Sequence, residues 1–178
     1  MYRSGMAKLN LPVIDRLEAT PELLRLLLDG LTEEDAQWKP APDRYSIAEV
    51  LEHLSHLEGH GYRARVDAVL GENEPEVVPY DDKALQAAGA YSGGNAEDSF
   101  DHFEDQRLDL IECLREQEAG VEKRKGRHPE IGLFTLEEML NAIAMHDLGH
   151  VRQITELVRA RQIQPALGGF SQWYSTKA

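Results

Sequence analysis

Apolar residues recur at three- and four-residue steps in four long segments of the chain. This period places the apolar side chains of each segment on one side of an α-helix. In the third segment the apolar set is Phe100, Phe103, Leu108, Ile111 and Leu114. The pattern predicts four amphipathic helices, over residues 12–30, 47–70, 95–118 and 136–161.

Two of these segments are preceded by a capping box. Ser46 is followed three residues later by Glu49, and Thr135 is followed in the same way by Glu138. In such a box the hydroxyl accepts a hydrogen bond from the backbone of the acidic residue, whose carboxylate bonds back to the backbone of the cap. The second and fourth helices are therefore predicted to begin at residues 47 and 136.

The first segment contains a proline, which allows two interpretations. Pro21 can start the main helix with Thr20 as its N-cap, or it can kink a longer helix that begins near Pro12. Gly30 is a natural stop for the helix in both interpretations.

The connections between the helices narrow the fold class. The link over residues 71–93, with a short helix expected at 82–88, is long enough to run the length of a bundle. The second and third helices therefore need not be antiparallel neighbours. Residues 119–134 are expected to form a loop, and the basic run at 122–128 a solvated turn. The chain, residues 1–178, is predicted to be one all-α domain with the architecture of a four-helix bundle.

Composition and charge limit the partners that the chain can have. Its 178 residues carry a formal net charge of −13, which disfavours contact with nucleic acid. No segment approaches the roughly 20 apolar residues that span a bilayer. The N-terminus lacks the apolar block of a signal peptide, so we expect a cytoplasmic protein with no membrane partner. Cys113 is the single cysteine, which excludes an intrachain disulfide.

Two histidines lie four residues apart on the fourth predicted helix. His146 and His150, with Asp147 between them, fall inside the buried stripe of that helix. Polar side chains in a core are costly unless they are satisfied, either by hydrogen bonds or by a metal ion. Asp147 follows His146 where the H-E-x-x-H motif has glutamate, so the segment is not that protease motif.

The second predicted helix offers a third histidine. His53 borders its buried stripe and is the third ligand that the geometry favours, with His60 in reserve. His56 lies near the far side and is expected to be solvated. Glu58 lies well inside the stripe and needs a partner. Three imidazoles from two helices would leave a coordination position open, which is typical of catalytic rather than structural metal sites.

Four stretches resemble the DinB/YfiT-like superfamily of metalloenzymes: W-K-P at 38–40, Y-S-I-A-E-V-L-E-H-L-S-H-L-E at 45–58, T-L-E-E-M-L-N-A-I-A-M-H-D-L-G-H-V-R-Q-I at 135–154 and G-G-F-S-Q-W-Y at 168–174. The resemblance covers about residues 11–174. It implies a bundle with up-down-down-up topology, usually dimeric, and a divalent ion, most commonly zinc or nickel, bound by His53, His146 and His150.

The resemblance also suggests a reaction. Characterised relatives include transferases that use small thiols such as bacillithiol or mycothiol. The first hypothesis is therefore a metal-dependent S-transferase in stress or detoxification, which binds a low-molecular-weight thiol and a small-molecule substrate. The alternatives are a metal-dependent hydrolase and a non-catalytic, stress-induced homodimer. Glu58 and Asp147 are candidate catalytic residues that orient ligands or move protons, or else they form a structural ion pair with an arginine such as Arg65 or Arg152. Gln153 is a candidate to bond a ligand.

Overall fold

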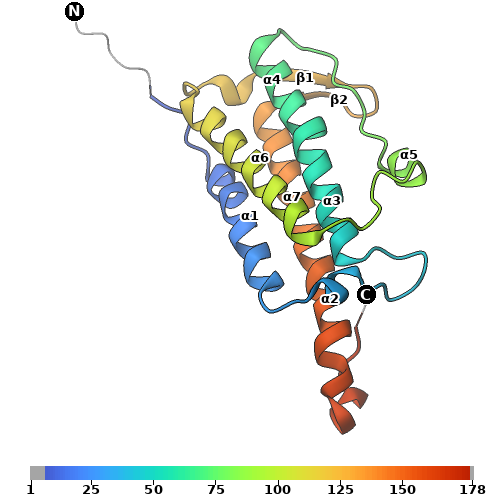
Figure 1. The fold of residues 1–178 in the computed structure, drawn as a ribbon. Helices are drawn as coiled ribbons and strands as arrows, with labels where there is room; N and C mark the ends of the chain where they lie inside the picture. Colours follow the sequence, from blue (N-terminus) through green and yellow to red (C-terminus); the bar gives the residue numbers. More distant parts are fainter. Residues whose placement is uncertain (1–6, 177–178) are drawn as a thin grey trace, which may run out of the picture.

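The computed structural model describes residues 7–176 and is dominated by long helices (Figure 1). These are α1 (Pro12–Leu28), α3 (Ile47–Leu57), α4 (Arg63–Gly71), α6 (Ala96–Glu116) and α7 (Leu136–Val158). One π-helical turn, Glu58–Tyr62, joins α3 to α4, so that together they form the second long rod.

The rods form a bundle in which α3 packs on α6, α6 on α1, α1 on α7, and α7 on α3. In Figure 1, α1 and α7 run in one direction, and α3 and α6 run in the other. The long link after α4 returns the chain to the starting end of α3, which allows α6 to run parallel to it. The predicted all-α four-helix bundle with up-down-down-up topology is confirmed.

The helix starts follow the predicted caps. Thr135 and Ser46 each form the complete capping box with Glu138 and Glu49. In α1 the longer-helix interpretation is correct, because the helix runs from Pro12 through Pro21 without interruption. Thr20 is therefore not an N-cap.

The expectation of a plain loop at residues 119–134 was wrong. Strands β1 (Lys125–His128) and β2 (Gly132–Thr135) pair there as an antiparallel hairpin, so the basic run is largely strand rather than a solvated turn. Gly126 faces Phe134 across the ladder, and a Cβ at Gly126 would lie 2.6 Å from the Phe134 ring and 3.0 Å from Val69. A side chain at position 126 would therefore require the Phe134 ring and Val69 to shift where the hairpin packs on α4.

Short elements complete the described chain. They are α2 (Glu33–Gln37), α5 (Asp82–Ala87), the 3-10 turns Val121–Lys123, Gln164–Ala166 and Gly168–Gln172, and a second π turn at Arg159–Ile163. The short helix expected at 82–88 is present as α5, whereas α2 was not predicted. No described helix is long and apolar enough to cross a membrane.

The apolar core is divided into two clusters along the bundle. One cluster includes Leu17, Leu110 and Ile143, and the other includes Leu24 and Ile154. The four rods each place one buried polar residue between these clusters: Thr20, Glu58, Arg107 and Asp147. This polar layer crosses the middle of the bundle, at the level where the histidines of α7 lie.

Candidate metal centre

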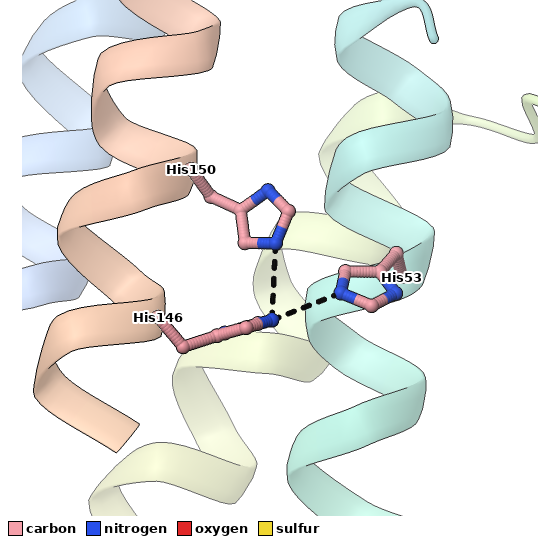
Figure 2. A group of neighbouring side chains, drawn as sticks. All are labelled: His53, His146 and His150. Carbon is pink, nitrogen blue, oxygen red and sulfur yellow. Dashed lines mark hydrogen bonds between the residues drawn. The ribbon is translucent and has the colours of Figure 1, made fainter. Parts of the chain in front are cut away.

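Three histidine rings converge from two helices (Figure 2). His53 comes from α3, and His146 and His150 come from successive turns of α7. The Nε2 atom of His146 lies 3.1 Å from Nε2 of His53 and 3.1 Å from Nε2 of His150. One ligand atom from each ring can be chosen so that all three lie within 4.8 Å of one another. The structure thus brings together the three residues that the sequence proposed as ligands.

Hydrogen bonding alone cannot satisfy this cluster. A neutral imidazole Nε2 carries either one hydrogen or one lone pair, so His146 can make a hydrogen bond to only one of its two nitrogen neighbours. A cation, in contrast, accepts a lone pair from each ring. Tetrahedral zinc with bonds of about 2.0–2.1 Å separates its ligand nitrogens by roughly 3.3 Å, which is close to the two observed spacings. The donor set therefore fits a divalent ion.

The outer nitrogens of two rings face groups that can orient them. His150 Nδ1 lies 2.9 Å from Oε1 of Gln153, which fixes Nδ1 as the protonated atom and leaves the Nε2 lone pair free. His53 Nδ1 lies 2.8 Å from Oδ1 of Asp82, in a direction that is poor for a hydrogen bond. His146 Nδ1 is buried and has no hydrogen-bond partner within residues 7–176.

Burial keeps the three rings neutral. Desolvation is the main cause that lowers the pKa of His53 and His150. For His146, desolvation together with the neighbouring His150 and His53 lowers the pKa to about 3. Because only the neutral ring offers a lone pair, the cluster is ready to bind a cation near pH 7.

A cavity of about 460 Å³ opens directly onto the three rings. Its walls combine charged, aromatic and apolar side chains, contributed by α3, the π turn, α4, the link before α6 and the hairpin. A volume of this size lies in the range of about 300–1,000 Å³ that is usual for small-molecule sites. Besides the histidine cluster, the lining residues are Leu57, Tyr62, Arg65, Pro79, Tyr80, Asp82, His128 and Glu130.

The two candidate catalytic carboxylates do not line this cavity. Glu58 and Asp147 are each 1% exposed and both pair with Arg107, which is fully buried. Arg107 donates to Glu58 through Nε at 2.7 Å and Nη2 at 2.8 Å, and to Asp147 Oδ2 through Nη1 at 2.6 Å. The hydroxyl of Thr20 donates to the same Asp147 oxygen at 2.9 Å. The ion-pair alternative is therefore correct.

The arginine named for that ion pair was wrong. Arg65 donates instead to the backbone oxygen of Val78, and Arg152 is exposed. Arg107 was missed because Leu108 was assigned to the apolar face of its helix. Leu108 is 49% exposed, and Arg107 occupies the buried position. The spacing Phe100, Phe103, Arg107, Leu110, Leu114 was a signal that could have found it.

The other histidines of α3 and the π turn lie outside the cluster. His60, the reserve ligand, stacks on His56 with ring centroids 4.4 Å apart. His56 was expected to be solvated but is half-buried, and its Nδ1 forms a hydrogen bond with the Tyr80 hydroxyl at 2.8 Å. Tyr80 in turn bonds to the hydroxyl of Tyr91 at 2.7 Å. Asp82, Tyr80 and Tyr91 all come from the long link, whose contribution to the site the sequence did not reveal.

Comparison with known proteins gives the same family from sequence and from structure. A sequence model described as the DinB superfamily matches residues 16–154. The chain is 24% identical to "Putative metal-dependent hydrolase OB0782" of Oceanobacillus iheyensis, over 83% of this chain and 85% of that protein. Its structure is similar to that of YfiT from Bacillus subtilis, with a TM-score of 0.73, 25% identity, and coverage of 83% of this chain and 85% of that one. YfiT is described as "a probable metal-dependent hydrolase with an unusual four-helix bundle topology".

Proposed function

The chain belongs to the DinB superfamily, and from this premise we propose that it is a divalent-metal-dependent hydrolase of small molecules. The observation that carries the proposal is the convergence of three imidazole Nε2 atoms beside a cavity of about 460 Å³. The similar proteins from O. iheyensis and B. subtilis carry the descriptions "Putative metal-dependent hydrolase" and "a probable metal-dependent hydrolase", which supports this choice of reaction.

The side chains of this protein have separate tasks in the proposed reaction. His53, His146 and His150 hold the ion as neutral ligands, and Gln153 keeps the His150 ring in the binding tautomer. When bound, a divalent ion supplies Lewis-acid chemistry, because it polarises a carbonyl oxygen and lowers the pKa of a water or thiol ligand. Asp82 lies beside the outer nitrogen of the His53 ring, with Oδ1 2.8 Å from Nδ1, and places a negative charge next to that ring.

Glu58 and Asp147 have a positioning role in this proposal and do not move protons. Their carboxylate oxygens are occupied by Arg107, and neither residue reaches the cavity wall. Among the acidic residues that do line the cavity, Glu130 and Asp82 are the candidates for a general base.

Metal content tests the site. Purified protein should contain close to one equivalent of zinc or nickel by inductively coupled plasma mass spectrometry. His53→Ala, His146→Ala and His150→Ala should each lose it, because two imidazoles bind a divalent ion much more weakly than three. His60→Ala is the matched control and should keep it. If His60→Ala loses the metal and His53→Ala keeps it, the assignment of ligands is wrong.

A panel of small esters and amides tests the reaction. Metal-loaded protein should hydrolyse at least one of them, chelator-treated protein should not, and added metal should restore the activity. Inertness of the metal-loaded protein across the panel would contradict the hydrolase proposal. Inertness in the thiol assay below as well would favour the non-catalytic, stress-induced dimer.

A thiol-dependent transferase is the second candidate, and one observation favours it. Glu58 and Asp147 pair with Arg107 and are therefore not available as bases. A thiol bound to a divalent ion ionises without a strong base, so a transferase reaction would not need them. A low-molecular-weight thiol titrated into cobalt-loaded protein should then produce an intense thiolate charge-transfer absorption. His53→Ala should lack it. A spectrum unchanged by thiol would remove this candidate.

The homodimer also stays a prediction. The C-terminal segment exposes Phe170, Trp173 and Tyr174 to 60%, 69% and 56%, which suits a contact with a second copy. Light scattering after gel filtration should give twice the monomer mass of 20.0 kDa.

A further inference from the structure

Arg65 is a cation without an anionic partner in the wall of the metal cavity. It is half-buried on α4, and the one side-chain hydrogen bond that it makes within residues 7–176 goes from Nη2 to the backbone oxygen of Val78, at 2.9 Å. No carboxylate within residues 7–176 lies within 4 Å of its guanidinium, whereas Arg63, two residues earlier, pairs with Asp67 at 3.0 Å. Burial lowers the pKa of Arg65, as expected for a charge that has lost water and gained no counter-ion.

Tyr62 is a second polar residue in the cavity wall near Arg65. It lies three residues before Arg65, on the same face. Its ring stands edge-on to His146 with centroids 5.7 Å apart, and no described residue hydrogen-bonds to its hydroxyl. Tyr62 therefore contacts a metal-ligand ring and lines the same cavity as Arg65, and its hydroxyl has no hydrogen-bond partner within residues 7–176.

The charges around the cavity leave Arg65 unbalanced. Asp82 and Glu130 are the acidic residues of the wall, and a divalent cation on the three histidines would offset both. The guanidinium then remains as the charge without a partner. Since Val78 occupies one donor, the remaining donors can form the planar pair that matches the two oxygens of a carboxylate.

We propose that Arg65 binds a carboxylate group of the substrate while the reacting carbonyl of the same molecule lies at the metal. This inference rests on the proposed hydrolase function and specifies its substrate class, a small ester or amide that also carries a carboxylate. Tyr62 donates to that carboxylate or to the atoms that connect it to the reacting carbonyl.

Binding of a product-like probe tests the inference without any catalytic turnover. Glutarate carries two carboxylates, one for the metal and one for Arg65, whereas monomethyl glutarate has only one. In calorimetric titrations of nickel-loaded protein, glutarate should bind at least about tenfold more tightly than the monoester, as expected for a charge-assisted pair. Arg65→Gln should remove this preference, and Arg65→Lys should reduce it.

Arg63→Gln is the matched control, because Arg63 is on the same helix and makes an exposed ion pair. It should keep the wild-type preference, and all three variants should keep the nickel content of the wild type. If Arg65→Gln still prefers glutarate, or if Arg63→Gln loses the preference equally, the inference is wrong.

The outcomes also separate this inference from the proposed reaction. A glutarate preference that depends on Arg65, in a protein that hydrolyses none of the esters, supports the carboxylate site and contradicts the hydrolase. Hydrolysis with equal kcat/KM for charged and uncharged esters in wild type and Arg65→Gln overturns the carboxylate site and leaves the hydrolase standing.

Discussion

Replacement of Arg107 by methionine should destabilise the protein severely. Arg107 is fully buried and is the counter-ion shared by Glu58 and Asp147, each 1% exposed. The substitution would leave two buried carboxylates without a cation. It would also remove the hydrogen bond to the backbone oxygen of Leu17 and the contact with the Phe103 ring, 4.9 Å from the guanidinium carbon.

The magnitude follows from the loss of one partner in a buried ion network. Removing one member of such a network costs about 3–5 kcal/mol, because the remaining charge stays desolvated. A domain has a total free energy of unfolding of about 5–15 kcal/mol, so Arg107→Met should remove a large part of this stability. Urea unfolding followed by circular dichroism, with unchanged m-value, measures the difference.

Two further variants separate charge burial from a loss of packing. The triple variant Glu58→Leu, Arg107→Met, Asp147→Leu removes all three charges, and it should recover most of the stability that the single change loses. Arg115→Met is the control on the same helix, because Arg115 forms exposed ion pairs with Asp15 and Glu18. This substitution should lower the free energy of unfolding by less than about 1 kcal/mol. A cost below about 1 kcal/mol for Arg107→Met would refute the reasoning, as would a triple variant less stable than the single one.

The other predictions concern the metal cluster. Zinc or nickel at about 100 times its dissociation constant should stabilise the fold by about 2.7 kcal/mol, seen as a higher melting temperature that chelator reverses and His146→Ala lacks. Metal-free protein should lose stability as the pH falls from about 6.5 toward 3, because burial lowers the pKa of His146 to about 3 and the unfolded chain therefore binds more protons in that window. The free energy of unfolding should fall by at most about 1.4 kcal/mol per pH unit because of this group. His146→Gln should reduce this pH dependence when the free energy of unfolding is measured across the acid range. Gln153→Leu should weaken metal affinity about 10–100-fold in competition with a chelator while circular dichroism stays unchanged, since Gln153 holds the His150 tautomer. An affinity equal to that of the wild type would show that Gln153 is an ordinary helix residue.

The sequence predicted what depends on helical period and local caps. The four rods, the two capping boxes and the pairing of His146 with His150 follow from residues that lie three or four apart. His53 was found because it borders the buried stripe of its own helix and because the family resemblance implied it. Arg107 was missed because Leu108, which is 49% exposed, was placed on the predicted apolar face, whereas the charged Arg107 occupies the buried position.

Other features depend on contacts between distant segments, which a helical period does not encode. Asp82 reaches His53 from a link whose path is set by tertiary packing. The hairpin is only four residues per strand, and it is positioned by Phe134 packing on Gly126 and by backbone bonds from residues 75–77 to Arg127. Such short, basic strands carry too little alternation to be distinguished from a loop.

The polar layer and the histidine cluster are parts of one arrangement. Asp147 directly follows His146 on α7, and successive helical residues point about 100° apart, so one faces Arg107 while the other faces the cavity. On the second rod, likewise, Glu58 pairs with Arg107 while His53 lines the cavity. Arg107 therefore fixes, from a third helix, the relative position of the two helices that supply the ligands. An apolar core alone could tolerate small rotations of these helices, whereas the directional bonds of the guanidinium cannot. The buried network therefore favours the arrangement of the two helices in which the three imidazoles converge.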